Sequence, residues 1–307
     1  MKRPASIRRV AVLYGGFSKE REISLVSGGA ADRALRAKGL DVTKIDVPRD
    51  MASLVAQIDA AKPDVVFNAL HGRYGEDGCI QGLLDMMAIP YTNSGRMASA
   101  VAMDKPAAKR MFAAAGIPVA EEKIVTVAEA ERGDVMARPY VLKPVNEGSS
   151  VGVKIVRAGD NHPPLDDLGL GKDDLIMAER FIPGREVTVA VMGDRPLAVT
   201  EITTGRDFYD YEAKYAKGGS KHALPADLPR AQYEKAMELS LIAHKVLGCR
   251  GVSRADLRLD GDTFYMLEVN TQPGLTPTSL VPEQANYVGL SFEDLMYWMV
   301  EHAECDA

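Results

Sequence analysis

Two carboxylates and an amide lie close together near the C-terminal end, on two neighbouring segments that alternate apolar and polar residues. Asp256 lies on the first segment, and Glu268 and Asn270 lie on the second. Asp260-Gly261-Asp262-Thr263 separates them and is a hairpin signal, so we expect two antiparallel strands. Oxygen ligands without a nearby His or Cys suit Mg²⁺, with Mn²⁺ as an alternative, bound together with phosphate groups. The sequence therefore predicts a metal site at Asp256, Glu268 and Asn270.

The length of the hairpin loop decides whether these side chains share one face of the sheet. A three-residue loop would set Asp256 opposite Met266 and Arg254 opposite Glu268, so that the polar groups converge. A two-residue loop would send Glu268 to the opposite face unless a β-bulge inserts one residue. We therefore expect an odd loop or a bulge. The alternative is a solvated sheet face with an Arg254–Glu268 ion pair.

A second polar group of residues follows the apolar run that contains Lys143. A lysine between apolar neighbours needs a partner for its charge, and a nucleotide phosphate is one such partner. A lysine that protects an edge strand is the alternative. Residues 148–152 match G-x-S-x-G, the nucleophile motif of hydrolases. Because the next residues have the pattern of a strand, a flap over phosphates is favoured over a strand-to-helix elbow carrying Ser150.

Other nucleotide-binding signals are weak or missing. The P-loop and dinucleotide-binding motifs do not occur. The loop 271–276 contains Gly274, whose backbone N–H could meet an anion. The run 177–182 would suit the edge of an adenine pocket, with Glu186 near a ribose, although such strands are commonly only structural.

The elements that must position these groups change character along the chain. In the first hundred residues, short apolar runs alternate with helical patterns at 9–14, 23–38, 42–47, 52–61 and 64–70, which predicts βαβ units in a parallel sheet. Loops 15–20 and 71–75 would then face one crevice beyond the carboxyl ends of the strands. We expect an α/β (α+β) fold in three parts, 1–104, 105–188 and 189–307.

Composition excludes several classes of protein. The chain has 307 residues and a formal net charge of -6, and no basic stripe interleaves with aromatics, which argues against nucleic acid as a partner. No stretch reads as a signal peptide or could span a bilayer, so no membrane partner is expected. The three cysteines lack metal-ligand spacing and suit a reducing, cytoplasmic location.

The ordered series of motifs resembles the ATP-grasp ligases, and most closely the D-alanine–D-alanine ligases. The motifs are GGFSKERE (15–22), ALHG (69–72), GEDG (75–78), MDK (103–105), KP (143–144), EGSSVG (147–152), FYDYEAKY (208–215), RAD (254–256) and LEVNT (267–271). The resemblance implies an ATP-grasp fold with an N-terminal Rossmann-like parallel-sheet domain. It also implies ATP-dependent joining of two D-alanines through an acyl phosphate, for peptidoglycan synthesis, by a homodimer.

The resemblance further implies roles for individual residues. ATP would be held by Lys105, Lys143, Glu179, Phe181, Ile182, Glu186, Lys214 and Phe264, with Lys214 at the terminal phosphate. Two magnesium ions would bind at Asp256, Glu268 and Asn270. Glu20 would accept the ammonium of the first D-alanine, His71 would lie beside its carboxylate, and Ser149 and Tyr215 would link to Glu20. Arg254 and the Gly274 N–H would form the oxyanion site, and Ser279 and Leu280 would meet the second carboxylate.

Other features of the chain qualify this resemblance. Thr278 stands where many members have His, which leaves the contacts of the second substrate open. Tyr215 implies an amine as the second substrate, and the loop 204–222 could serve as a lid over the site. The alternatives are another carboxylate–amine ligase, a nucleotide-binding regulator without turnover, and a serine hydrolase that uses Ser150.

Overall fold

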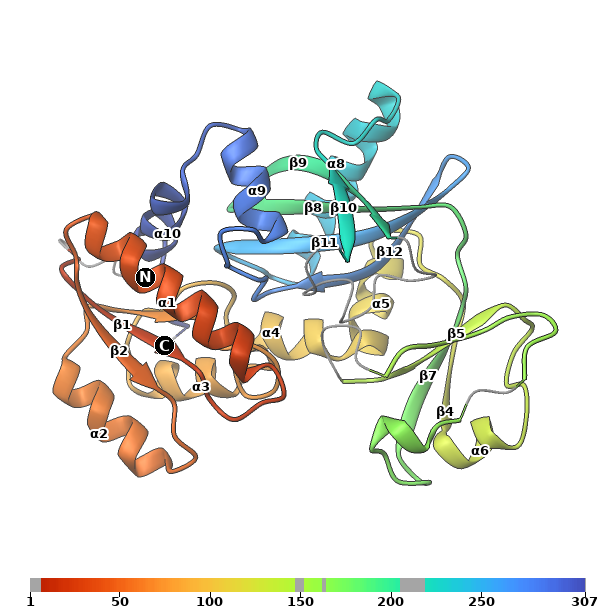
Figure 1. Cartoon of the computed structure of the whole chain (residues 1–307), viewed down its shortest axis with the longest axis horizontal. Helices are drawn as coiled ribbons and strands as arrows, with labels where there is room; N and C mark the ends of the chain where they lie inside the picture. Colours follow the sequence, from red (N-terminus) through yellow and green to blue (C-terminus); the bar gives the residue numbers. More distant parts are fainter. Residues whose placement is uncertain (1–6, 147–151, 162–163, 205–218, 307) are drawn as a thin grey trace.

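The computed structural model describes residues 7–146, 152–161, 164–204 and 219–306 (Figure 1). It contains a parallel sheet of order β2-β1-β3 and two antiparallel sheets, of order β4-β7-β5-β6 and β10-β9-β8-β11-β12. Figure 1 shows the parallel sheet with its helices at one end of the molecule and the four-stranded sheet at the other. The mixed α/β class expected from the sequence is confirmed.

The N-terminal part has the predicted βαβ order. Its elements are β1 (Arg9–Tyr14), α1 (Arg21–Ala37), β2 (Asp41–Asp46), α2 (Met51–Ala61), β3 (Val65–Asn68), α3 (Cys79–Met86) and α4 (Arg96–Met103). Val10 and Val12 pack in a core cluster with residues of α1, whereas Ala11 and Leu13 pack in another with residues of α2 and α3. Helices therefore cover both faces of β1, which explains its unbroken apolar run.

The central part forms a small antiparallel sheet with one covering helix. Its elements are α5 (Lys105–Ala114), β4 (Glu122–Thr126), α6 (Val127–Glu131), β5 (Tyr140–Pro144), β6 (Lys154–Val156), the 3-10 turn η1 (Asp166–Leu168) and β7 (Leu175–Arg180). β6 pairs antiparallel with β5. The segment after the G-x-S-x-G motif is thus a strand, so the strand-to-helix elbow of a serine hydrolase is wrong for this chain.

The C-terminal part supplies the five-stranded sheet and the helices that pack on it. Its elements are β8 (Arg185–Met192), β9 (Arg195–Thr204), β10 (Ser220–Ala223), α8 (Arg230–Val246), β11 (Val252–Asp260), β12 (Thr263–Asn270), α9 (Leu280–Tyr287) and α10 (Phe292–Glu301). The expected boundary at 188–189 falls inside β8, which pairs with β11 in this sheet over 185–192. A boundary at Gly184 keeps each sheet whole.

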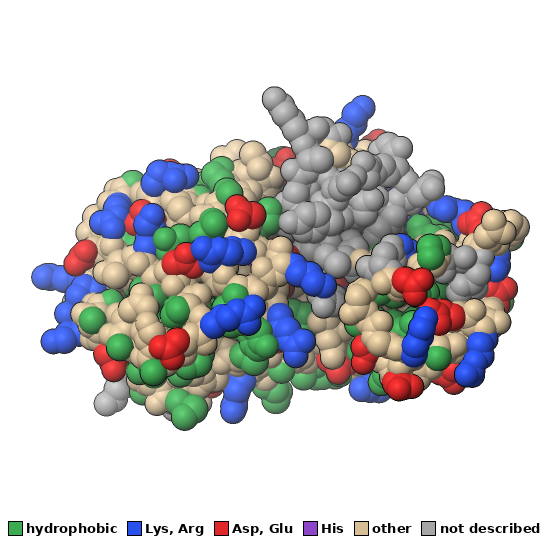
Figure 2. Space-filling view, turned by 60° about the horizontal axis from the view of Figure 1, so that its bottom comes forward, with side chains coloured by type: hydrophobic (Ala, Val, Ile, Leu, Met, Phe, Trp, Pro, Cys, Tyr) green, Lys and Arg blue, Asp and Glu red, His purple; other side chains and the backbone are tan. Residues whose placement is uncertain are grey.

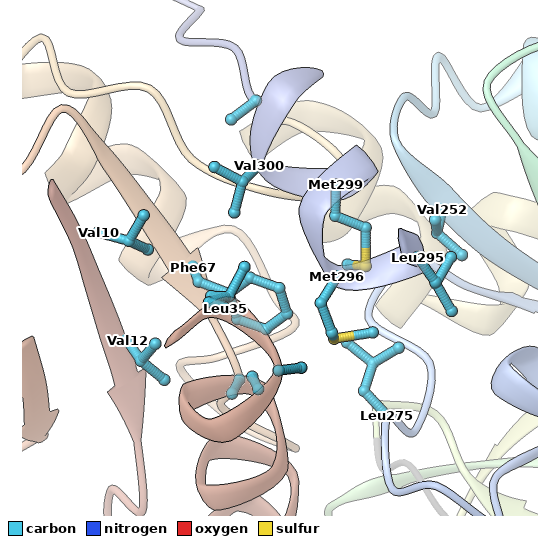
Figure 3. Packing of buried hydrophobic residues seen from close by; sticks show 14 of the residues in the cluster. Val10, Val12, Leu35, Phe67, Val252, Leu275, Leu295, Met296, Met299 and Val300 are labelled. Atoms are coloured by element: carbon cyan, nitrogen blue, oxygen red, sulfur yellow. The ribbon is translucent and has the colours of Figure 1, made fainter. Parts of the chain in front are cut away.

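The last helices join the C-terminal sheet to the N-terminal part. One buried cluster contains Val12 and Phe67 of the parallel sheet together with Val252 of β11 and Met296 and Met299 of α10 (Figure 3). The sequence pattern predicts separate parts, whereas the structure shows a shared core. This core fixes the carboxyl edge of the parallel sheet relative to the metal-site hairpin.

The molecular surface carries charges of both signs. On the face in Figure 2, basic and acidic side chains are interspersed over the described residues. Within the described ranges, no helix combines the length and the apolar character that a membrane crossing needs.

Candidate functional site

The hairpin β11–β12 brings the predicted metal-site residues to one face by means of a β-bulge. Asp260 pairs with Thr263, so the turn has two residues, and the register shifts between Asp256 and Leu257. Asp256 therefore lies opposite Glu268, and Arg254 lies opposite Asn270. The three-residue loop, with Asp256 opposite Met266, is wrong. The bulge that the sequence required in its place is confirmed.

Asp256 is held by hydrogen bonds from three sides. Thr188 Oγ1 on β8 donates to its Oδ1 at 2.6 Å, and Asn270 Nδ2 donates to its Oδ2 at 3.0 Å. The Arg254 guanidinium donates to both oxygens, with Nε at 2.8 Å and Nη2 at 2.7 Å. Asp256 is only 8% exposed. The alternative of a solvated face with an Arg254–Glu268 pair is therefore wrong.

The chemistry of this set fits magnesium bound together with phosphate. The Glu268 side chain makes no hydrogen bond or ion pair with the described residues, so its carboxylate is available to a cation. No group of three or more His, Cys, Asp or Glu within those residues could hold a metal alone. Two carboxylates and an amide leave most of an octahedral Mg²⁺ shell to water and phosphate oxygens.

A small pocket brings two residues of this set, Glu268 and Asn270, together with Lys105 and Glu76. It is lined by Glu76, Ala102, Met103, Lys105, Glu268, Val269, Asn270 and Thr271. Lys105 begins α5, and its backbone N–H donates to Val145 O at 3.4 Å at the end of the Lys143 strand. The predicted ATP-binding Lys105 thus lies beside the predicted metal ligands Glu268 and Asn270.

Lys143 and Glu179 meet in a buried ion cluster on the four-stranded sheet. Lys143 Nζ donates to Glu179 Oε2 at 2.6 Å, and Lys109 Nζ of α5 donates to Glu179 Oε1. Lys109 also pairs with Glu122 at 2.7 Å. Burial opposes ionisation of Glu179, but the positive charges of Lys143 and Lys109 outweigh it and keep its pKa below the ordinary value. The cluster therefore stays ionised and fixes Lys143 over the sheet.

Arg258 on β11 fixes the turn between β7 and β8, where the other predicted ATP-binding residues lie. Its Nη1 donates to Glu186 Oε2 at 3.1 Å and its Nε donates to Ile182 O at 3.2 Å. The guanidinium lies 5.7 Å from the centre of the Phe181 ring. Phe264 packs in the hydrophobic core, 2% exposed, under the same hairpin. The structure thus gathers Phe181, Ile182 and Glu186 around one arginine.

The loops after β1 and β3 meet as the sequence predicts. Ser18 Oγ donates to His71 O at 2.7 Å and accepts from Glu20 N at 3.2 Å. His71 is fixed by Ser27 at 3.1 Å from Nε2 and by Glu76 at 3.2 Å from Nδ1. The two loops therefore lie in contact, whereas their facing a common crevice stays a prediction. Glu20 and His71 are both buried, 7% and 5% exposed.

The residues predicted for the oxyanion site and the second substrate line a single pocket of ≈ 390 Å³. It is lined by Ile23, Val26, His222, Arg254, Gly274, Thr276, Pro277, Thr278, Ser279 and Leu280. Ser279 precedes α9, and its Oγ accepts from Thr276 N at 3.1 Å. His222, which the sequence did not indicate, pairs with Glu283 at 2.8 Å. Arg254 therefore joins this pocket to the metal-site residue Asp256.

Some predicted residues fall outside the described part of the chain. These are Ser149, Lys214 and Tyr215, and the loop 204–222 except its ends.

Sequence reasoning missed residues whose partners are distant in the chain. Lys109 follows Lys105 by one helical turn, a weak signal, but its partner Glu179 is 70 residues away. Thr188 looks like an ordinary strand residue until β8 is placed beside β11. Arg258 alternates with Arg254 and Asp256 on the same strand, which is the one signal that could have indicated it.

Two antiparallel sheets that carry a lysine–glutamate cluster and a carboxylate pair, beside a Rossmann-like domain, define an ATP-grasp enzyme. The chain belongs more narrowly to the D-alanine–D-alanine ligase family. The family model described as D-ala D-ala ligase C-terminus matches residues 111–301, and the N-terminus model matches 49–94. This family joins two D-alanines at the expense of ATP for peptidoglycan synthesis, so the chain is an ATP-dependent carbon–nitrogen ligase.

Individual relatives agree with this assignment over nearly the whole chain. A D-alanine–D-alanine ligase of Rhodospirillum rubrum is 60% identical over 98% of this chain and 99% of its own. One from Paramagnetospirillum magneticum is 57% identical over 97% and 99%. The crystal structure of the Bacillus anthracis ligase complexed with ATP has a TM-score of 0.81 and 29% identity, covering 97% of both chains. The VanG D-Ala:D-Ser ligase of Enterococcus faecalis has a TM-score of 0.79 and 28% identity, covering 96% and 99%.

Proposed function

We propose that this site activates the carboxylate of one D-alanine with ATP and transfers the acyl group to the amine of a second D-alanine. The observation that supports the proposal most directly is the bidentate Arg254–Asp256 ion pair. It joins the pocket lined by Gly274 and Ser279 to the carboxylate set beside Lys105. Phosphate transfer and acyl transfer can therefore take place at adjacent points.

The chemistry needs two displacements. A carboxylate oxygen of the first D-alanine attacks the terminal phosphorus of ATP, ADP leaves, and an acyl phosphate forms. The amine of the second D-alanine then attacks the acyl carbon, loses a proton, and expels inorganic phosphate that keeps the attacking carboxylate oxygen. Activation is necessary because a free carboxylate is a poor electrophile.

Asp256, Glu268 and Asn270 would hold magnesium, two ions in the full site. A metal held by these residues would supply positive charge against the negative charge of the transferring group. Lys105 and Lys143 add positive charge from the neighbouring elements, with Lys214 as the proposed contact to the terminal phosphate. On the other side, the nucleotide would be enclosed by Phe181, Ile182, Glu186 and Phe264, beside Glu179.

Arg254 and the Gly274 N–H would stabilise the oxyanion that forms on attack by the amine. Loss of one such donor typically raises the barrier by ~3 kcal/mol. The Arg254 fork is already oriented by Asp256, so little reorganisation is needed during the reaction.

The two amino-acid substrates would be held by separate residues on either side of the carbon–nitrogen bond that forms. Glu20 would bind the ammonium of the first D-alanine and His71 would lie beside its carboxylate, with Ser149 and Tyr215 linked to Glu20. Ser279 and Leu280 at the start of α9 would bind the second carboxylate, because helix N-termini favour anions.

We further propose that the enzyme works in the cytoplasm as a homodimer, with three parts in each chain and the second boundary at Gly184. Met86 on α3 and Met97 on α4, 88% and 65% exposed, support a contact with a second copy at these helices. Light scattering of the wild type and of Met86→Lys/Met97→Lys tests this contact. A monomeric wild type would exclude it.

Phosphate release from ATP and Mg²⁺ tests the function, with D-alanine, L-alanine or D-serine added. We expect release with D-alanine, one dipeptide per phosphate, and no stimulation by L-alanine. If a mixture of D-alanine and D-serine gave D-alanyl-D-serine in preference to D-alanyl-D-alanine, the second substrate would be D-serine. Release that does not depend on D-alanine would contradict the proposal.

A further inference from the structure

A buried cluster of three side-chain amides joins the N-terminal part to the loop after β12. Gln272 Nε2 donates to Asn68 O at 2.6 Å, and Asn93 Nδ2 donates to Gln272 Oε1 at 2.5 Å. Asn68 Nδ2 lies 3.4 Å from the same Gln272 oxygen. Asn68, Asn93 and Gln272 are at most 3% exposed. The Gln272 amide is thus bonded at both its nitrogen and its oxygen, which selects a single orientation.

One end of this cluster fixes the loop that carries His71. Asn68 Oδ1 accepts from Leu70 N at 3.1 Å, and Asn68 Nδ2 donates to Gly75 O at 3.0 Å. Gln81 Nε2 of α3 donates to the same Gly75 oxygen at 2.8 Å. The start and the end of loop 71–75 are therefore both bonded to the residue that Gln272 contacts.

The other end of the cluster lies on the loop of the oxyanion site. Gln272 is two residues before Gly274, and Pro273 between them restricts the backbone. A shift of the Gln272 side chain is thus transmitted to Gly274 through one rigid residue. Both loops lie at the shared core of the N- and C-terminal parts, and this packing sets the approximate distance between them. The directional hydrogen bonds of the amides then fix that distance more narrowly.

An apolar side chain would fill the same space without this directional restraint. Burying amides in place of methylene groups carries a desolvation cost that is offset only when every donor and acceptor is paired. Gln272 has a partner at both its nitrogen and its oxygen, whereas Asn93 Oδ1 is buried without a hydrogen-bond partner among the described residues. The cluster therefore carries part of that cost, and what the amides provide in return is the directional restraint on Gln272.

We propose that Gln272 is a positioning residue that sets the distance between the first substrate, beside His71, and the oxyanion donor Gly274. The inference rests on the proposed roles of His71 and Gly274. Its consequence concerns the acyl phosphate, which hydrolyses if its carbonyl is misplaced and the amine attacks late. Gln272 thereby controls how many dipeptides form for each ATP consumed.

The test compares Gln272→Met with the wild type. Methionine keeps the length and the flexibility of the side chain but removes the donor and the acceptor. We expect dipeptide per phosphate to fall from about one to below about one half, and kcat/KM for D-alanine to fall about tenfold or more. The KM for ATP should stay within about twofold, because none of the residues proposed to hold ATP belongs to the amide cluster.

Tyr91→Phe serves as the matched control. Tyr91 lies two residues before Asn93, and its hydroxyl donates to Asp85 at 2.9 Å. The loss of this hydroxyl removes a partly buried hydrogen bond near the same junction without touching either loop. This variant should keep the wild-type product ratio even if its melting temperature falls. If Gln272→Met does not fold, Asn93→Gly tests the inference in its place, because it removes one donor to Gln272. Glycine tolerates the φ of 69° at this position. Asn93→Gly should lower the product ratio in the same direction, by less.

A wild-type product ratio and wild-type D-alanine kinetics in Gln272→Met, or in Asn93→Gly if it must decide, would overturn the inference. An equal fall in Tyr91→Phe would overturn it too, because the effect would then reflect general loosening. Arg254→Ala is measured alongside. If it retains full activity, the proposed oxyanion site fails; if only the amide variants behave as wild type, the positioning role alone fails.

Discussion

Asp256 on β11 lies directly opposite Glu268 on β12 because the bulge leaves Leu267 as an extra residue between two registers. The carboxylate pair therefore depends on one irregular position. The regular register set by the two-residue turn would have put Leu267 opposite Asp256 and turned Glu268 toward the other face.

The first prediction concerns the position of the Glu268 carboxylate. Glu268→Gln should reduce kcat by about 100-fold or more and raise the Mg²⁺ concentration for half-maximal activity, because one of two carboxylates is lost. The matched control is the exchange Leu267→Glu/Glu268→Leu, which keeps the composition and moves the carboxylate by one residue. It should not restore activity. Wild-type rates in the exchange variant would show that the metal set is not defined by this face.

Arg254→Lys tests the guanidinium fork. Lysine keeps the charge but cannot form two parallel bonds to Asp256, so kcat should fall by about 100-fold with a smaller change in the KM for ATP. Initial rates with varied ATP and D-alanine measure this. A variant within about threefold of wild type in every parameter would show that charge alone suffices at this position.

Gly72→Ala tests the approach of Glu20 to the His71 loop. A Cβ at Gly72 would lie 2.5 Å from Glu20 Oε2, and its φ is +71°. We expect a loss of stability of about 1–2 kcal/mol and an increase of about tenfold or more in the KM for D-alanine. Gly39→Ala is the control, because Gly39 has a φ of +83° and nothing within 4 Å of its Cβ position. It should lose similar stability and keep its KM; an equal KM in both variants would contradict the role of this contact.

Lys109→Met tests the buried cluster under the nucleotide. Lys109 is 2% exposed and pairs with Glu122 and Glu179, so its loss leaves two carboxylates without their shared cation. We expect a loss of about 3 kcal/mol in the free energy of unfolding and a raised KM for ATP. Urea unfolding and steady-state kinetics measure these. Lys172→Met, which removes an exposed partner of Glu131, should leave both nearly unchanged. Equal midpoints for the two variants would contradict the prediction.

His244 should make stability depend on pH. Burial lowers the pKa of His244 to about 4, and its Nδ1 lies 2.7 Å from Ser253 Oγ. The unfolded chain takes up this proton near pH 6.5 and the folded chain only near pH 4. The contribution of neutral His244 to the free energy of unfolding is therefore complete above pH 6.5 and is lost as the pH falls to 4. That loss amounts to about 3 kcal/mol. Unfolding free energies at pH 7 and pH 4.5 should differ less in His244→Gln than in the wild type. An unchanged difference would assign the pH dependence to other groups.

The sequence indicated the parts of the fold that depend on local pattern. The apolar runs and helical periods of the first seventy residues predicted β1 to β3 in order, and the need for an odd loop or a bulge followed from alternation along β11 and β12. Contacts between distant segments did not leave such a pattern. Lys109 meets Glu179 only after the central sheet forms, and Gln272 meets Asn68 only when the two ends of the chain share a core.

The most direct test of ligation through an acyl phosphate follows one oxygen atom. The enzyme is incubated with ATP, Mg²⁺ and D-alanine labelled with ¹⁸O in the carboxylate. Mass spectrometry then measures the ¹⁸O content of the released phosphate and the amount of dipeptide. Attack of the carboxylate on ATP predicts one ¹⁸O in each phosphate released and an equal amount of D-alanyl-D-alanine. Dipeptide formed with unlabelled phosphate would contradict the mechanism, and labelled phosphate without dipeptide would contradict the ligation.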